Sequence, residues 1–235
     1  MLKGFYKCEY GFVGDRLMRS VMYVHEGRML GGNSAFAHDG TYHEDNGEIV
    51  AEIISRRHTD DPNYQSLLGQ DTGSISVRGR PDGQFTYRFE GTSPQIPGAV
   101  FRSMMTPLAE EPIPADAVGE GGIPNGLYSV HLRTLGGIDG DLNGVMLLND
   151  GRILGGDAFF YYLGTYTSSH GRWKGQIVNQ EHTPAMGENP VFGGHEVGIG
   201  FSGACNDAGA ELEAAALAGK RSIRLTAALK LLRRV

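Results

Sequence analysis

The sequence predicts an all-β protein made of two tandem, small, antiparallel eight-stranded β-barrels. Glycine supplies 36 of the 235 residues, about twice the usual ~7 %, and each interior glycine costs a helix about 1 kcal/mol relative to alanine. Apolar and polar residues alternate with a period of two in many short segments, which is typical of strands with one buried face. The chain also repeats itself at a spacing near 120 residues, the length of a whole domain.

The repeat is clearest in two eight-residue segments. Residues 26–33 (EGRMLGGN) return as residues 150–157 (DGRILGGD), at an offset of 150 − 26 = 124. Residues 109–124 are rich in Pro, Gly and acidic residues, which cannot continue a strand or a helix. The sequence therefore predicts a first domain over residues 1–108, a linker over 109–124 and a second domain over 125–235.

Each domain is expected to hold eight strands. In the first strand Tyr6, Cys8, Tyr10 and Phe12 share one face, which predicts that this face is buried. Closing eight antiparallel strands into an up-and-down barrel removes exposed edges, and a β-sandwich is the structural alternative. The remaining strands of the first unit are expected at Arg19–His25, Arg28–Gly31, Ala35–Tyr42, Glu48–Ser55, Ser74–Gly79, Gln84–Phe89 and Val100–Thr106.

Turn residues support this order of strands. Glu26-Gly27 and Asp150-Gly151 lie between apolar runs and can supply the positive φ angles of a tight hairpin. The paired glycines of the repeat lie between two strands, which indicates a bulge or sharp corner where no Cβ fits. This structural motif comprises Gly31, Gly32 and Asn33 in the first copy and Gly155, Gly156 and Asp157 in the second.

Two segments have ambiguous local chemistry. Glu211–Ala218 has the composition of a helix, but the repeat aligns it with Phe85–Gly91, whose alternation is that of a strand. We predict a strand, because tertiary context often overrides propensity in short segments. Asn63–Leu68, between the fifth and sixth strands, could form a short helix, at a position that suits a plug across a barrel mouth.

Charge and apolar content bear on location and partners. The net charge of −6 disfavours direct nucleic-acid binding, which needs a basic face. No apolar run reaches the ~18 residues of a membrane span, and residues 1–7 (MLKGFYK) have charges where a signal peptide needs an apolar stretch. Two cysteines are too few for a disulfide framework and are expected to be free thiols. Together these features predict a cytoplasmic protein with no membrane partner.

Metal binding is not predicted, although one motif raises the question. Asp139–Gly144 (DGDLNG) matches the first six positions of an EF-hand calcium loop, with Asp150 at the twelfth. A strand rather than a helix is expected to follow, so we interpret the segment as a polar hairpin loop and leave calcium binding open. The eight histidines lack the spacing of a zinc site. His58 and His182 occupy equivalent positions in the two copies, which indicates an architectural role.

Catalysis is not predicted either, and no cofactor is expected. Cys8 lies on the core face between Tyr6 and Tyr10, where an apolar setting raises a thiol pKa and makes it unreactive. Cys205 has no base positioned beside it in sequence. The chain has no GxSxG elbow, no P-loop and no GxGxxG motif before a helix.

A family resemblance adds to these inferences. Gly126-Leu127-Tyr128, Gly155-Gly156-Asp157, Tyr161 and Gly164 resemble the pattern of the GrlR family, negative regulators of type III secretion genes. The resemblance implies small β-barrels of lipocalin-like (calycin-like) appearance that are not enzymes. It also implies binding of a helix-turn-helix transcriptional regulator through an acidic loop after the Gly-x-Tyr strand. In this chain the residues at that loop are Glu44, Asp45 and Glu48.

A barrel of this size either packs its interior or encloses one ligand. In the first copy Phe85, Tyr87 and Phe89 offer large rings, whereas the aligned stretch of the second copy offers alanines, so any apolar cavity is expected in the second domain. Its candidate lining residues are Trp173, Phe159, Tyr162, Ala214 and Ala216.

The leading functional hypothesis is a non-enzymatic, cytoplasmic regulatory or adaptor protein that binds a protein partner. The alternative is a carrier or sensor of a small apolar ligand, with the cavity in the second domain, and an enzyme ranks third. The sequence leaves the partner, the ligand and a homodimeric state open.

Overall fold

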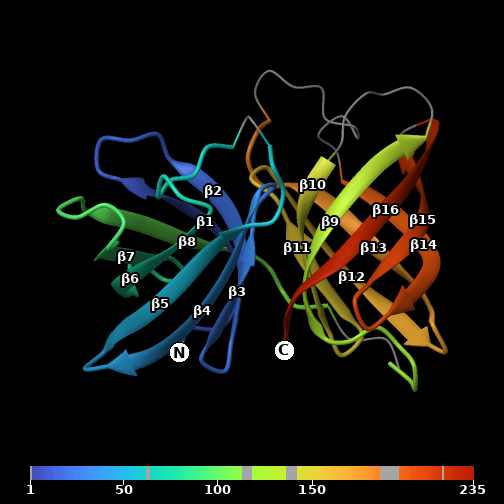
Figure 1. Cartoon of the computed structure of the whole chain (residues 1–235), viewed down its shortest axis with the longest axis horizontal. Helices are drawn as coiled ribbons and strands as arrows, with labels where there is room; N and C mark the ends of the chain where they lie inside the picture. The colour runs from blue at the N-terminus through green and yellow to red at the C-terminus, as the bar shows by residue number, and fades with distance from the viewer. Residues whose placement is uncertain (1, 62–63, 113–117, 136–141, 186–195, 219) are drawn as a thin grey trace. The chain divides into compact units, whose positions relative to one another are not determined.

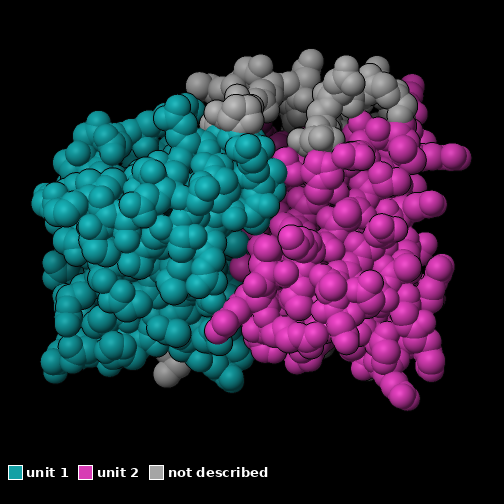
Figure 2. All heavy atoms as spheres, viewed as in Figure 1, with its two compact units in different colours: residues 1–110 teal, residues 111–235 magenta. Residues whose placement is uncertain are grey.

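The chain folds as two closed β-barrels. The computed structural model describes residues 2–61, 64–112, 118–135, 142–185, 196–218 and 220–235. Within these ranges every regular element is a strand, and the strands form two antiparallel eight-stranded barrels in tandem (Figure 1). The predicted fold class is confirmed. The compact units comprise residues 1–110 and residues 111–235 (Figure 2).

Membrane-spanning helices can be assessed for the same residues. None of the described segments forms a helix long and apolar enough to cross a membrane.

The first barrel is an up-and-down meander in which each strand pairs with its neighbour in sequence. β1 pairs with both β2 and β8, so the sheet closes on itself and leaves no free edge. Its strands are β1 (Gly4–Phe12), β2 (Met18–His25), β3 (Arg28–Gly32), β4 (Phe36–Asp45), β5 (Glu48–Arg57), β6 (Thr72–Pro81), β7 (Tyr87–Thr92) and β8 (Phe101–Ala109).

The second barrel repeats this topology and closes through pairing of its first and last strands, β9 and β16. Its second strand begins 142 − 18 = 124 residues after that of the first barrel, the offset found in the sequence. Its strands are β9 (Gly126–Leu135), β10 (Leu142–Asn149), β11 (Arg152–Gly156), β12 (Phe160–Ser169), β13 (Arg172–Glu181), β14 (Val197–Asn206), β15 (Gly209–Ala218) and β16 (Arg221–Arg234).

The two acidic-glycine turns have the predicted geometry. Glu26 and Gly27 have φ angles of 45° and 79°, and Asp150 and Gly151 have φ angles of 47° and 80°. Two successive positive φ angles are those of a type I′ turn, whose twist matches that of the strands it joins. Each turn therefore fixes the register of one hairpin, β2–β3 or β10–β11.

The Gly-Gly-Asn/Asp motif forms the corner after the third strand of each barrel. A Cβ at Gly31 would lie 2.0 Å from the carbonyl oxygen of Val21, so only glycine fits there. Asn33 Oδ1 accepts hydrogen bonds from the backbone N–H groups of Ala35 (3.0 Å) and Phe36 (2.9 Å). Asp157 makes the same two bonds in the second barrel, to the N–H groups at 159 and 160.

His58 and His182 tie the same corners to the ends of β5 and β13. His58 Nε2 lies 3.1 Å from the carbonyl oxygen of Asn33, and His182 Nε2 lies 3.3 Å from that of Asp157. In both cases Nδ1 contacts the hydroxyl of the following threonine. The repeated contacts support the architectural interpretation of these histidines.

β15 is a strand despite its helical composition, as the repeat predicts. The alignment within it needs correction, however. Val77 pairs with Gly91 and its counterpart Phe201 pairs with Ala214, which gives an offset of 214 − 91 = 123 for this strand. The sequence alignment used an offset of 211 − 85 = 126. Phe85, expected to fill the interior, is instead 64 % exposed in the β6–β7 connection.

Candidate ligand-binding cavity

The interior of the first barrel contains a cavity of about 60 Å³. A single water needs roughly 10–15 Å³, so the space holds several waters or the body of a small molecule. Its wall is mostly apolar and is formed by inward-pointing side chains from all eight strands. The apolar lining residues are Met18, Met22, Met29, Phe36, Ile53, Leu67, Leu68, Ile75, Val77, Phe89, Phe101 and Met105.

This position corrects the sequence prediction, which placed any apolar cavity in the second domain. The interior volume of a barrel is a sum over eight strands, and the prediction compared only the seventh. Other strands of the second barrel carry larger side chains at some of the equivalent positions, which a comparison of the seventh strand alone does not include.

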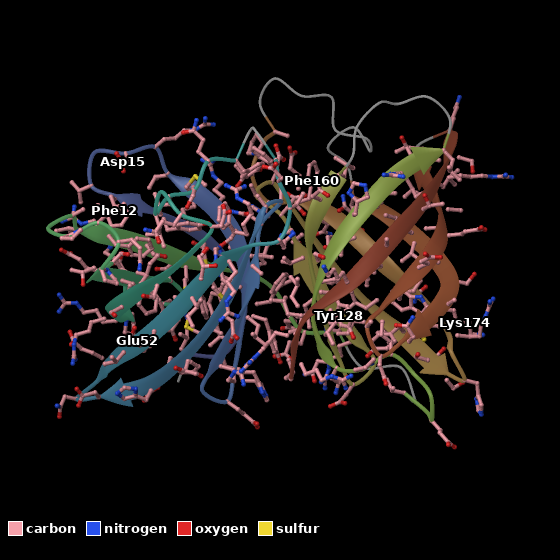
Figure 3. The ribbon with its side chains drawn as sticks, in the orientation of Figure 1. Phe12, Asp15, Glu52, Tyr128, Phe160 and Lys174 are labelled. Atoms are coloured by element: carbon pink, nitrogen blue, oxygen red, sulfur yellow. The ribbon has the colours of Figure 1, made fainter. Side chains whose placement is uncertain are left out.

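The second barrel has aromatic rings at positions where the first has smaller side chains. At the 124-residue offset, Trp173 replaces Ile49 and Phe201 replaces Val77. Both rings are buried, with their centroids 4.6 Å apart. Trp173 Nε1 donates a hydrogen bond to the carbonyl oxygen of Glu211 (3.1 Å), which satisfies its polar group. Tyr128 lies in the same core and is labelled in Figure 3.

Tyr162 takes the place of His38. Its ring lies over Gly155, where a Cβ would come within 2.1 Å of Tyr162 Cε2, and its hydroxyl donates to the carbonyl oxygen of Val145. A Cβ at Gly144, the counterpart of Ser20, would lie 3.3 Å from the same hydroxyl. The tyrosine therefore occupies space that both smaller residues leave open in the first barrel.

The other residues predicted to line a second-barrel cavity lie in or near its core. Ala216 is buried, and Ala214 packs against the same core. Phe159 is half-buried at the corner between β11 and β12. A role of these residues in ligand binding stays a prediction.

A short irregular segment covers the first barrel at the cavity. Leu68 is buried in the core, and a Cβ at Gly73 would lie only 2.4 Å from its Cδ1. Ser66 Oγ donates to the carbonyl oxygen of Gln70 (2.5 Å), which holds a tight turn. The predicted short helix is wrong for residues 64–68, which form no helix, and Asn63 lies outside the described residues. The expected position across the barrel mouth is supported, since Leu67 and Leu68 line the cavity.

A polar chain runs from the Asn33 corner into the cavity. Asn33 Nδ2 donates to Tyr10 Oη (3.2 Å), and Tyr10 Oη lies 3.2 Å from His38 Nε2. Burial lowers the pKa of His38 to about 4, with a smaller contribution from His58, so the imidazole is neutral at pH 7. Burial also raises the pKa of Tyr10, which keeps its proton.

Neither Tyr10 nor His38 was proposed as a binding residue from the sequence. The sequence placed Tyr10 in the core and considered His38 only as a zinc ligand. The available signal was the alternation in Phe36–Gly40, which puts His38 on the same inward face as Phe36. A histidine on a core face is a polar group that needs a partner.

Cys8 also lines the cavity and lies where the sequence predicted. Burial raises its pKa to about 12, so the thiol stays protonated and is a poor nucleophile at neutral pH.

The acidic residues predicted to bind a partner lie on the β4–β5 hairpin. Glu44 is exposed, but Asp45 and Glu48 both face Arg78, whose Nη1 lies 3.4 Å from Asp45 Oδ2 and 3.5 Å from Glu48 Oε2. Arg78 offsets part of the negative charge of the hairpin. A helix-turn-helix partner at this surface stays a prediction.

Metal ligands were searched among the same described ranges. No group of three or more His, Cys, Asp or Glu side chains there could hold a metal ion. Asp139 to Asp141 of the calcium-like motif lie outside those ranges. Asp150, the twelfth position, is in a hairpin turn and accepts a hydrogen bond from Asn125 Nδ2 (2.6 Å).

Comparisons with known proteins give little beyond the fold. No family model and no curated protein matches the chain, so the resemblance to the GrlR family stays a prediction. A solved structure that it resembles is described as a "putative outer membrane protein" from Bacteroides fragilis. The identity is 9 %, the TM-score is 0.29, and the match covers 97 % of this chain and 96 % of that one.

That description differs from two predictions. A cytoplasmic location and a cytoplasmic regulatory or adaptor function do not fit that description, and the description does not favour the carrier with a second-domain cavity either. Neither prediction is retained. At a TM-score of 0.29 the likeness carries no argument about what this chain does.

Proposed function

We propose that the first barrel binds one small, predominantly apolar molecule in its interior. The observation that carries the proposal is the contrast between two barrels of the same topology. The second packs Tyr162, Phe201 and Trp173 at positions where the first has His38, Val77 and Ile49.

The energetics favour an occupant. An apolar molecule that covers these apolar walls removes their surface from water, which contributes roughly 25 cal/mol per Å² of apolar surface buried. The second barrel shows that this scaffold accommodates larger rings, since Trp173 and Phe201 are buried there. The first barrel instead lines its space with flexible methionine side chains, which adapt to irregular apolar shapes.

The methionines provide the assay. Met18, Met22, Met29 and Met105 line the cavity, whereas Met146 lies in the core of the second barrel. With ¹³C-methyl-labelled methionine, addition of methylenecyclopentane or cyclopentanone is expected to shift the four cavity resonances and leave Met146 unchanged. Equal shifts at Met146, or none at the cavity residues with either probe, would contradict the proposal.

A matched variant separates binding from nonspecific effects. Ser20→Gly with His38→Tyr installs in the first barrel the pair found at Gly144 and Tyr162 in the second. The new ring should fill the cavity, with its hydroxyl bonded to the backbone as Tyr162 bonds to Val145. We expect binding of both probes to weaken at least tenfold without loss of the fold, because a filled core gains packing. Unchanged affinity in this variant would place the probes elsewhere.

A further inference from the structure

The series of hydrogen bonds from Asn33 through Tyr10 to His38 indicates which nitrogen of His38 donates toward a ligand. It begins at Asn33, whose side-chain orientation is determined by its neighbours. Asn33 Oδ1 accepts from the N–H groups of Ala35 and Phe36, so its Nδ2 is the donating end. Nδ2 donates to Tyr10 Oη and to the carbonyl oxygen of Arg19, both at 3.2 Å.

Tyr10 connects Asn33 to His38 by hydrogen bonds. Its hydroxyl already accepts a hydrogen bond from Asn33, and its one proton can be donated to His38 Nε2 at 3.2 Å. The two rings meet edge to face, with centroids 5.8 Å apart. A neutral imidazole that accepts at Nε2 carries its proton at Nδ1. We therefore assign the proton of His38 to Nδ1; the other arrangement, in which Tyr10 donates to Ser20 and accepts from His38 Nε2, is distinguished by the tautomer measurement below.

This donor has no partner in the protein. His38 is 6 % exposed and lines the cavity, and its Nδ1 makes no hydrogen bond within the described part of the chain. A buried donor left unpaired is unfavourable, and a ligand atom that accepts from it removes that penalty. In the second barrel the equivalent residue, Tyr162, instead donates a hydrogen bond to the carbonyl oxygen of Val145.

The charge of the wall restricts the acceptor. Every side chain described as lining the cavity is neutral at pH 7, the buried His38 included. A carboxylate or phosphate placed there would lose its hydration without gaining a cation, which is strongly unfavourable. A neutral oxygen such as a carbonyl has no such penalty.

We propose that the ligand of the first barrel is a small neutral molecule with a carbonyl oxygen that accepts a hydrogen bond from His38 Nδ1. This inference rests on the proposed function and adds the chemical class of the ligand. Asn33 and Tyr10 are positioning residues, because they set the tautomer of His38; Tyr10 also lines the cavity.

The tautomer is tested first, without a ligand. In protein labelled with ¹⁵N-histidine, long-range ¹H–¹⁵N spectra distinguish a protonated Nδ1 from a protonated Nε2, and His38→Leu assigns the signal. We expect the proton at Nδ1. Asn33→Asp supplies the residue that Asp157 provides in the second barrel and keeps the same backbone bonds. Its carboxyl accepts from Tyr10, so the His38 proton should move to Nε2.

Ligand preference is tested with two probes of nearly the same shape. Cyclopentanone has a carbonyl oxygen where methylenecyclopentane has a CH₂ group. The ratio of their dissociation constants, measured from the methionine methyl shifts, is compared between the native protein and His38→Leu, which cancels differences in solvation. We expect the ketone preference to fall roughly tenfold in His38→Leu, as the loss of one buried hydrogen bond implies.

The outcomes separate the two proposals. An equal ratio in both proteins, with binding retained, would overturn the carbonyl assignment and leave the cavity as a binding site. A native His38 protonated at Nε2 would also overturn it. Failure of both probes to bind the native protein would overturn the proposed function and this inference together.

Discussion

Acidification should selectively destabilise the first barrel through His38. Its pKa is lowered from 6.5 to about 4 in the folded state because the ring is buried. Between these two values the unfolded chain binds a proton that the folded chain does not, so stability is fully present above about pH 6.5 and falls as the pH drops toward 4. Between pH 7 and pH 5 the loss from this one residue is about 2 kcal/mol.

The assay uses the one cysteine of each barrel. Cys8 and Cys205 are both buried, so in a Cys205→Ala background a pyridyl disulfide reagent labels Cys8 much faster once the first barrel unfolds. Urea unfolding followed in this way at pH 7 and pH 5 gives the free energy of unfolding of the first barrel. Trp173, the single tryptophan, reports on the second barrel in the same samples.

His38→Leu isolates the contribution of this residue. Burial also lowers the pKa of His58, which adds a loss in the same direction that both proteins share. The native protein should therefore lose about 2 kcal/mol more than His38→Leu over this pH range. Equal losses in the two proteins would show that His38 is not buried as a neutral base, and the reasoning would fail.

Two further predictions concern the second barrel. Gly203→Ala should destabilise it by about 1–3 kcal/mol, because the new Cβ would lie 1.8 Å from the carbonyl oxygen of Glu211. Gly200→Ala on the same strand meets nothing within 4 Å and should change stability very little. Both effects are measured as the urea midpoint of Trp173 fluorescence. Trp173→Ala should cost about 3–5 kcal/mol in far-UV circular dichroism melts, whereas Leu217→Ala, at a residue 69 % exposed, should stay within about 0.5 kcal/mol. Equal effects within either pair would contradict the packing described.

The fold could be predicted from the sequence because its signals are local and duplicated. The turns at Glu26-Gly27 and Asp150-Gly151 need only two residues each to set a hairpin. The Glu211–Ala218 segment was ambiguous by composition, and the repeat resolved it as part of β15. Because the pattern occurs twice, each copy independently predicts the strands of the same fold.

The cavity could not be predicted in the same way. Its volume depends on side chains from every strand, including the exchange of Ile49 for Trp173 and of His38 for Tyr162, and not only on the alanines of β15. The alignment of β15 was also three residues out, 126 against 123; the second hairpin is one residue shorter than the first, which lowers the offset from 124 to 123, whereas the sequence alignment raised it. The spacing of residues in the sequence therefore predicts where strands lie, but it does not predict the volume left inside the barrel.

Closure of the first sheet has a kinetic consequence. Every strand is hydrogen-bonded on both sides, so no gap in the wall can open without breaking a ladder of backbone bonds. A molecule can enter or leave only through an end of the barrel, and Leu67 and Leu68 obstruct the one beside the cavity. Exchange should then be governed by how often these two leucines swing aside, so that probes of different affinity share one slow association rate.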